Sequence, residues 1–335
     1  MLPSIPSTVH VVQLPLRVRF RGIDVREVLL LRGPAGWGEF APFPEYDDTE
    51  AAWWLAAALE SAWWGPPAPL RDTVTVNATV PAVGAEQVSQ VLAQFPGCTT
   101  AKVKVAQQGQ ALADDLARVA AVRAQIARVR VDANGGWSVH EAVQALTALR
   151  AQGVLEYAEQ PCAGVAELAE VRTRLTAAGV QVPIAADESI RRAEDPLRVA
   201  QAGAADVAVL KVPPLGGMRR VLALAQRLRT EHRMPVVISS ALDSAVGMSA
   251  GLAAAAALPG LEYACGLATG GLLAEDVTAA VRPVEGRLPI GAVAPDARRL
   301  QQLAAPPDRA LWWRERLSRC HALLAGGHPA WPPSA

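Results

Sequence analysis

Apolar and charged positions alternate along the middle of the chain in a repeating pattern. Short runs of β-branched or small apolar residues each end in an ionisable side chain. These end residues lie 24 to 28 positions apart along the chain: Lys104, Asp132, Glu159, Asp187 and Lys211. A strand, a loop, a helix and a return loop together take about 30 residues. The pattern therefore predicts consecutive parallel strands whose charged ends meet at one end of a barrel.

Segments with helical periodicity separate these strands. Leu112 and Leu116, for example, lie on one apolar face between two of them. Counting from residue 73, the alternation predicts eight strands, the last at 261–265, and Asn77 extends the strand-end repeat backwards. An open doubly wound sheet is the alternative, but no GxGxxG turn follows a strand. We therefore predict an α/β fold of the TIM-barrel type.

The two ends of the chain differ from this repeat. Residues 8–40 have the pattern of antiparallel strands, a helix is predicted to begin near Asp48, and a proline-rich linker follows at 65–69. Residues 282–290 are predicted to form a strand that returns to the N-terminal unit. We accordingly divide the chain into an N-terminal α+β domain (1–70), a barrel (71–275) and a C-terminal segment that returns to the first domain (276–335).

Composition narrows the class of protein. Half of the 335 residues are hydrophobic, and the formal net charge is zero without a basic stripe, which argues against a nucleic-acid partner. The four cysteines are scattered without a CxxC pair, as in proteins of a reducing compartment. No secretion signal is evident at the N-terminus. The uncharged stretch 244–261 contains Pro259-Gly260 and fits a buried barrel helix better than a membrane span. We expect a cytoplasmic protein.

Two lysines share one face of a predicted strand. Alternate strand residues point to the same side, so Lys102 and Lys104 face one way while Val103 and Val105 face the other. With the valines against the surrounding helices, both ammonium groups lie inside the barrel, where burial is costly unless the site uses them. We expect Lys102 to lower the pKa of Lys104 towards that of a useful base.

Each strand-end residue has an ordinary explanation when it is taken alone. Asp132 and Asp187 could cap helices, Glu159 could be a solvated loop acid, and Lys211 could be a surface lysine. Their recurrence at one strand end, in step with the repeat, favours a shared site. Carboxylate oxygens suit Mg²⁺ or Mn²⁺ better than zinc. A divalent cation with a lysine on each side suits removal of a proton next to a carboxylate.

Several short motifs carry a resemblance to a known family. The segments in question read Lys-Val-Lys (102–104), Asp-Ala-Asn (132–134), Glu-Gln-Pro (159–161), Ala-Asp-Glu-Ser (186–189) and Leu-Lys-x-x-x-x-Gly-Gly (210–217). In these motifs the chain resembles the muconate-lactonising subgroup of the enolase superfamily, over nearly its whole length. Residues 36–46, 239–244 and 269–273 look most like the o-succinylbenzoate synthase family of menaquinone biosynthesis, in its actinobacterial-type form.

The resemblance implies a fold and a set of residue roles. The fold is a modified (β/α)7β barrel with an α+β capping domain formed by the N-terminal unit. Asp132, Glu159 and Asp187 are the implied ligands of Mg²⁺, for which Mn²⁺ is a possible substitute. Lys104 is the implied general base and then acid of a syn-dehydration, and Lys211 is the cation on the opposite face. Glu188 and Asn134 support the site, and the implied contacts of a small carboxylate substrate are Asn134, Ser239, Ser240, Gly266, Arg21 and Phe43.

Other functions stay open at this point. An N-acylamino-acid racemase or a dipeptide epimerase would use the same two lysines. However, 239–243 reads Ser-Ser-Ala-Leu-Asp rather than the Asp-x-Asp expected of a dipeptide epimerase. A barrel that binds a carboxylate without turnover is a third reading, against which the intact set of charged residues argues. The sequence does not fix the oligomeric state, and a monomer is compatible with it.

Overall fold

The computed structural model describes residues 2–6, 8–20, 22–191 and 195–329. The chain begins with a three-stranded antiparallel sheet in the order β1-β2-β3, with bounds Val9–Phe20, Ile23–Gly33 and Gly36–Phe40. Helix α1 (Asp48–Trp63) follows and packs on β3. Its first turn is capped by Asp47, whose carboxylate accepts a hydrogen bond from the backbone N–H of Glu50 at 2.8 Å. This α+β unit matches the prediction for the N-terminal part.

A seven-stranded parallel sheet forms the centre of the molecule, in the order β11-β10-β9-β8-β7-β6-β5. Its strands are β5 (Ala78–Val80), β6 (Thr100–Lys104), β7 (Arg128–Asp132), β8 (Ala158–Glu159), β9 (Ile184–Ala186), β10 (Val207–Leu210) and β11 (Val236–Ile238). In this register Lys104 lies opposite Asp132, and Asp132 lies opposite Glu159. The repeat therefore brings three of its strand-end residues side by side.

The barrel is closed by a two-residue connection rather than by a full strand. Cys265 bridges to Val76, just before β5, and Gly266 bridges to Ser239, just after β11. The backbone N–H of Asn77 donates to the Cys265 carbonyl at 3.0 Å, and that of Gly266 donates to the Ile238 carbonyl at 2.9 Å. The prediction of a strand at 261–265 is therefore wrong. Only Cys265 and Gly266 form bridges, one to each neighbouring strand end.

A helix follows each of the seven barrel strands. They are α2 (Val88–Leu92, after the 3₁₀ turn η1, Ala85–Gln87), α3 (Leu112–Arg123), α4 (Val139–Ala151), α5 (Val165–Ala177), α6 (Asp195–Gln201), α7 (Met218–His232) and α8 (Ala245–Ala257). After the closing residues, the described chain forms only the 3₁₀ turn η3 (Thr269–Leu272) in place of an eighth helix. The modified (β/α)7β barrel with a separate cap is therefore confirmed.

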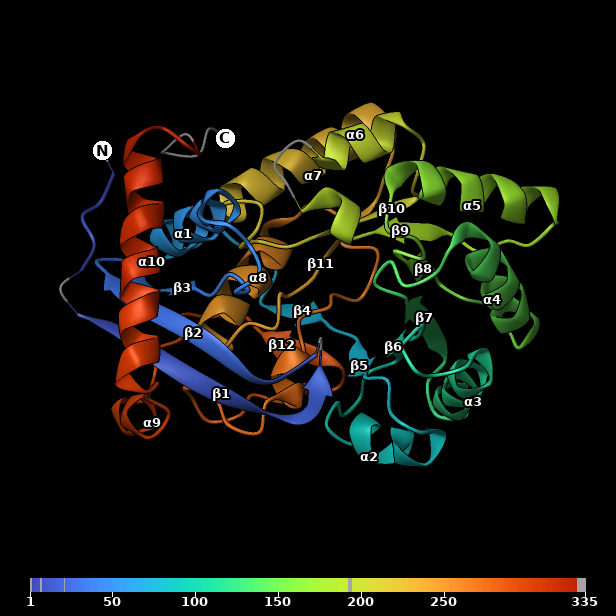
Figure 1. Ribbon diagram of the computed structural model, residues 1–335, viewed down its shortest axis with the longest axis horizontal. Helices are drawn as coiled ribbons and strands as arrows, with labels where there is room; N and C mark the ends of the chain where they lie inside the picture. Colours follow the sequence, from blue (N-terminus) through green and yellow to red (C-terminus); the bar gives the residue numbers. More distant parts are fainter. Residues whose placement is uncertain (1, 7, 21, 192–194, 330–335) are drawn as a thin grey trace.

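The C-terminal segment contacts both other parts of the molecule. Strand β12 (Arg287–Pro289) pairs with β4 (Thr73–Thr75), so the prediction that this strand returns to the N-terminal sheet is wrong. Leu288 of β12 lies opposite Val74 of β4, and both are buried. After α9 (Ala297–Gln302), helix α10 (Pro307–Ala325) runs beside β1 and α1 (Figure 1). The domain boundaries at residues 70 and 275 stay predictions.

The uncharged stretch at 244–261 forms α8, as predicted. Ser244 caps this helix, and most of its residues are buried against the barrel and the segments around it. In the described ranges, every helix is too short or too polar to span a bilayer.

Candidate active site

The two lysines of β6 point into the barrel and meet carboxylates from the next two strands. The Nζ atom of Lys104 lies 2.5 Å from Asp132 Oδ2. The Nζ atom of Lys102 lies 2.6 Å from Glu159 Oε1 and 3.1 Å from Asp132 Oδ2. Val103 belongs to the core between the sheet and its helices. The alternation predicted from the sequence therefore places both amines in one polar layer.

The other predicted pair lies further along the sheet. Lys211, directly after β10, donates from Nζ to Asp187 Oδ2 at 2.5 Å. Arg191 follows the 3₁₀ turn η2 (Glu188–Ile190), and one of its terminal nitrogens lies 3.6 Å from the same oxygen. Strands β7, β8 and β9 separate Lys211's strand from that of Lys104. The two lysines thus hold different carboxylates from different sides of the barrel mouth.

Asn134 and Glu188 connect the two halves of this layer. Asn134 Oδ1 accepts a hydrogen bond from Lys104 Nζ at 2.7 Å, and its Nδ2 donates to Glu188 Oε1 at 3.0 Å. Asn134 has φ of +47°, a conformation that asparagine tolerates better than most residues. Glu188 is also paired with Arg191. These contacts fit the supporting role predicted for both residues.

A small cavity of about 30 Å³ lies over these side chains. Ser239, Ser240 and Gly266 line it, as expected, and Ser240 shares a 2.6 Å hydrogen bond with Thr269. A side chain at Gly266 would collide with the hydroxyl of Ser239, so this wall requires glycine. From the N-terminal sheet, Phe20 reaches the cavity, and its ring centroid lies 5.2 Å from Lys104 Nζ.

Phe43, a predicted substrate contact, is not brought to this cavity. Phe43 is buried in the N-terminal unit, where its ring packs edge-on against Tyr46 and Trp54 and lies 4.2 Å from the Arg26 guanidinium. Phe43 is not among the residues that line the cavity. Arg21 lies outside the described residues.

Sequence reasoning missed several residues that line the cavity. Thr79 lies opposite Lys102 in the sheet, whereas Asn77, which the repeat placed at this level, lies lower and accepts a hydrogen bond from Arg130. The alternation of polar residues in 73–79 could have identified Thr79. Arg191 could have been found from its spacing of three and four residues from Glu188 and Asp187, which suits ion pairs on one helical turn.

The lysine composition is itself a signal. The chain has 32 basic residues, yet its only lysines are Lys102, Lys104 and Lys211. All three line this one cavity, and every other basic residue is an arginine. Compact ammonium groups are therefore confined to the site, as expected where a side chain must exchange a proton, which the guanidinium group does not do in proteins.

Burial and neighbouring charges act in opposite directions on the pKa values here. Burial favours the neutral forms of Asp132 and Asp187, but the adjacent lysines hold both pKa values well below the ordinary range. Burial and the neighbouring Asp132 raise the pKa of Glu159 to about 8. Burial lowers the pKa of Lys211, against the pull of Asp187, whereas Glu159 and Asp132 outweigh burial and raise the pKa of Lys102.

The donor set fits a hard divalent cation. Glu159 Oε2 and Asp187 Oδ1 are buried and have no hydrogen-bond partner among the described residues. Asp132, Glu159 and Asp187 offer only oxygen atoms, as Mg²⁺ prefers. In the described part of the chain, no three Asp, Glu, His or Cys side chains lie close enough together to hold a metal ion without moving. The lysines hold the carboxylates instead, so a bound metal would have to draw them away from these partners.

Comparison with known proteins agrees with this architecture. The family model described as "Enolase C-terminal domain-like" matches residues 85–296, and "Enolase N-terminal domain-like" matches residues 11–62. The chain belongs to the enolase superfamily. Enzymes of this superfamily generally depend on a divalent metal ion. Catalytic groups at the carboxyl ends of barrel strands are also the rule for this type of fold.

Within the superfamily, the chain is similar to proteins named o-succinylbenzoate synthase. That of Mycobacterium tuberculosis (strain H37Rv) is 59% identical over 97% of this chain and 98% of the relative. That of Mycolicibacterium smegmatis is 60% identical over 96% and 98%. Among solved structures, the muconate lactonizing enzyme from Pseudomonas putida has a TM-score of 0.71 at 21% identity, covering 89% of this chain and 98% of that one. The latter likeness shows the fold alone.

Proposed function

We propose that this enolase-superfamily chain is an o-succinylbenzoate synthase. The reaction is the syn-dehydration of 2-succinyl-6-hydroxy-2,4-cyclohexadiene-1-carboxylate to 2-succinylbenzoate, a step of menaquinone biosynthesis. Relatives of that name, about 59% identical over almost the whole chain, carry this proposal. The paired lysines and carboxylates at the barrel mouth supply the chemistry that it needs. The four buried free cysteines suit the reducing cytoplasm.

The two strand-end lysines take the acid–base roles. Lys104, as the neutral amine, removes the proton next to the ring carboxylate, and the carbon–oxygen bond to the ring hydroxyl then breaks. Lys104 returns that proton to the departing hydroxyl, so water leaves and the ring becomes aromatic without an oxidant. Lys211 faces the reacting carboxylate from the other side as a cation. Lys102 holds Glu159 and adds positive charge beside Lys104.

The acidic side chains hold the metal ion in this proposal. Asp132, Glu159 and Asp187 are the proposed ligands, with Mg²⁺ as the metal and Mn²⁺ as a substitute. The two buried, unpartnered carboxylate oxygens of Glu159 and Asp187 support this assignment. When bound, the cation would stabilise the negative charge that develops on the substrate carboxylate.

The charge of the site supports a substrate with two carboxylates. The site holds four cationic side chains and four carboxylates, which cancel when all are ionised: Lys102, Lys104, Arg191, Lys211, Asp132, Glu159, Asp187 and Glu188. A divalent metal adds two positive charges. The proposed substrate, with its ring carboxylate and succinyl carboxylate, offsets the net positive charge that remains even when Lys104 is neutral. A dipeptide, whose amine and carboxylate cancel, does not.

Racemisation of N-succinyl amino acids is the second candidate. It is favoured by the placement of Lys104 and Lys211 on different sides of the barrel mouth, because one lysine could remove a proton and the other return it from the opposite face. Such substrates also carry two carboxylates. Loss of optical rotation from an N-succinyl amino acid would reveal this activity.

The dehydration is tested by mixing purified protein, Mg²⁺ and the hydroxycyclohexadiene substrate and following the absorbance of the diene. We expect rapid loss of this absorbance with the natural sequence. Lys104→Ala should lower the rate by about 10²–10⁴-fold, the usual contribution of a general acid–base group. An unchanged diene signal, or equal rates for the two proteins, would refute the proposal. The exposed substitution Glu262→Gln, remote from the cavity, is the matched control and should leave the rate unaltered.

A further inference from the structure

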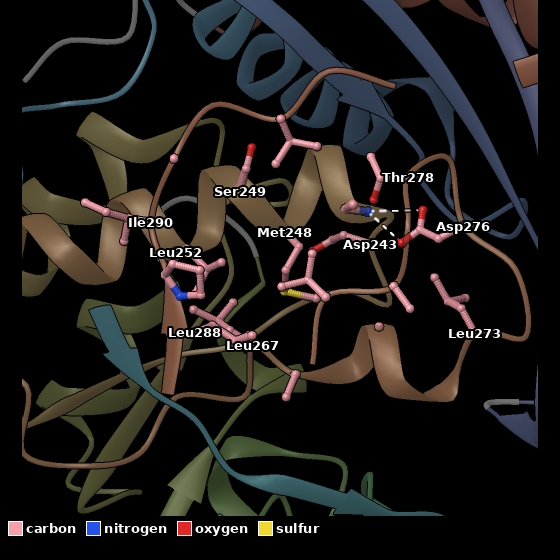
Figure 2. Close-up of a pocket in the computed structure, with 18 of the residues that line it drawn as sticks. Asp243, Met248, Ser249, Leu252, Leu267, Leu273, Asp276, Thr278, Leu288 and Ile290 are labelled. Atoms are coloured by element: carbon pink, nitrogen blue, oxygen red, sulfur yellow. Dashed lines mark hydrogen bonds between the residues drawn. The ribbon is translucent and has the colours of Figure 1, made fainter. Parts of the chain in front are cut away.

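The missing eighth helix leaves a second, much larger cavity. This pocket of about 430 Å³ lies between α8, η3 and the chain that follows η3. In the seven complete units a helix follows the barrel strand, whereas here the loop 273–281 and the segment 288–293 supply much of the wall of the pocket. Pockets of this size are typical of small-molecule sites. Figure 2 shows the side chains that line it.

The acidic side chains gather on one side of the pocket and most of the larger apolar ones on the other. In Figure 2, Asp243, Asp276 and Thr278 lie on one side, together with Leu273, and Leu252, Leu288 and Ile290 lie on the other, together with Ser249; Met248 and Leu267 lie between them. Both Asp276 oxygens accept from the backbone N–H of Ala245, at 3.0 and 3.3 Å. A compact amphiphilic molecule would match this division, with its apolar body among the leucines and its polar end at the aspartates.

Asp243 is the feature that points to a ligand. Its side chain is 3% exposed, and Oδ2 accepts a hydrogen bond from the backbone N–H of Ala241 at 3.1 Å. Its other oxygen, Oδ1, has no hydrogen-bond partner among the described residues. A buried carboxylate oxygen without a donor is costly, and a ligand that supplies the donor removes this cost.

The charges around the pocket specify the ligand's polar end. Among the described residues that line the pocket, Asp243, Glu275 and Asp276 are acidic and Arg299 alone is basic. Arg299 is already engaged with Glu275 Oε2 at 3.1 Å and with the Asp276 carbonyl at 3.2 Å. The lining is therefore net negative and favours a cation.

We propose that this pocket binds a compact alkyl- or arylamine, with its ammonium group at Asp243 and its hydrocarbon body against Met248, Leu252 and Leu288. The pocket is separate from the lysine cavity but shares walls with it. Ala241 and Leu242 line the lysine cavity, whereas the next residue, Asp243, lines this pocket. Likewise, Gly266 lines the lysine cavity and Leu267 lines this pocket. The proposal concerns binding and does not depend on the dehydration activity.

The test is calorimetric titration of the full-length protein with three probes that share one body: 4-phenylbutylamine, 4-phenylbutanol and 4-phenylbutanoate. We expect the amine to bind at one site per chain, at least tenfold more tightly than the alcohol, with the carboxylate weakest. Saturating 2-succinylbenzoate, which is directed to the lysine cavity, should leave amine binding in place. Equal affinity for all three probes, or displacement of the amine by 2-succinylbenzoate, would overturn the proposal.

Two variants locate the binding. Asp243→Asn should weaken the amine about tenfold and leave the alcohol unchanged, and Leu252→Trp should fill the pocket and abolish binding of both. Glu262→Gln, an exposed acid outside the lining, is the matched control and should bind as the natural sequence does. Tight amine binding in a folded Leu252→Trp protein would contradict the proposal. Should that variant not fold, the probe series and Asp243→Asn decide the question.

Discussion

Two layers of buried charge lie one above the other inside the barrel, and they are built differently. In the lower layer Arg130 is paired with Glu156, donates to Asn77 Oδ1 at 3.2 Å and to a backbone carbonyl at 2.7 Å. Its guanidinium also lies 4.6 Å and 5.6 Å from the ring centroids of Tyr157 and Tyr263. One anion, an amide oxygen, a backbone carbonyl and two aromatic faces thus surround this cation.

In the upper layer, hydrogen-bond donors are shared unequally among the carboxylate oxygens. Asp132 Oδ2 receives both Lys102 and Lys104, while Glu159 Oε2 and Asp187 Oδ1 receive no donor from the described chain. Among the described residues of the lower layer, a nitrogen of Arg130, next to the tyrosine rings, lacks a hydrogen-bond partner. The carboxylate oxygens without a donor can bind a cation, and the lysine amines beside them can bind an anionic substrate. The contrast matches the proposal that the charge of the lower layer is buried for the fold and that of the upper layer for chemistry.

The largest expected effect concerns the upper layer. Lys211→Met removes the cation that we place on the far side of the substrate and should lower kcat about 10²–10³-fold, as for other groups that stabilise developing charge. Initial rates with saturating Mg²⁺ measure it. A loss of less than tenfold would mean that Lys211 only holds Asp187 in place. Arg130→Met is the matched comparison, since it also removes one buried cation.

In the lower layer the same kind of change should act on the fold. Arg130→Met leaves Glu156 without its partner and should cost about 3 kcal/mol in the free energy of unfolding. The kcat of the folded fraction should stay within about twofold, because Arg130 does not line the lysine cavity. Urea unfolding and active-site-normalised rates give the two numbers. A large fall in kcat at unchanged stability would abolish the distinction between the layers.

Glu39 tests burial without a dedicated cation. This residue connects the N-terminal sheet to α8 through Ser244 and Gly247. Burial and the neighbouring Asp243 raise its pKa to about 8, so the folded protein keeps a proton that the unfolded chain releases near its ordinary pKa of about 4.5. Stability from this group is therefore complete below about pH 4.5 and is lost as the pH rises through about 8.

For Glu39 we expect unfolding free energy to fall by about 2 kcal/mol between pH 6 and pH 8. Glu39→Gln should remove its own share of this slope, while Glu159, whose pKa is also raised to about 8, still contributes over the same range and Asp276, whose pKa burial raises to about 6, contributes below it. Thermal unfolding at intervals of half a pH unit measures the slope. An identical slope in the variant would show that Glu39 is already ionised in the folded protein.

The smallest expected effect lies at the contact between cap and barrel. Tyr46 accepts a 2.8 Å hydrogen bond from Arg191, which in turn holds Asp187 and Glu188. Tyr46→Phe removes one hydrogen bond, worth about 0.5–1.5 kcal/mol, and should raise KM about three- to tenfold with kcat little changed. Steady-state kinetics separate the two constants. A fall in kcat alone would place Tyr46 in the chemical step instead.

The sequence predicted those site residues whose positions follow from the local periodicity of strands and βα units. Strand alternation and the βα repeat placed Lys102, Lys104, Asp132 and Glu159 correctly, because neighbouring parallel strands keep these residues in register. Contacts across the fold were not accessible in this way. That Phe20 rather than Phe43 covers the cavity depends on how the N-terminal sheet docks on the barrel, which no repeat in the sequence encodes.

The closure of the barrel escaped prediction for a related reason. Residues near 265 have the apolar character of a strand, yet the chain pairs only through Cys265 and Gly266. Whether residues 261–266 pair with strands on both sides depends on how the whole barrel closes, and not on the sequence of this segment alone. The same applies to β12, whose pairing with β4 is a contact between segments more than 200 residues apart.

The confinement of lysine to one cavity has a consequence for covalent modification. Apart from the N-terminus, the chain presents no primary amine outside the site, since Lys102 and Lys211 are 7% and 8% exposed and the Lys104 side chain is 13% exposed. Acylating agents and amine-directed crosslinkers modify lysines over the whole surface of most proteins. On this chain they would meet lysine side chains only at the barrel mouth. Any lysine adduct on this chain would therefore report directly on access to the proposed catalytic centre.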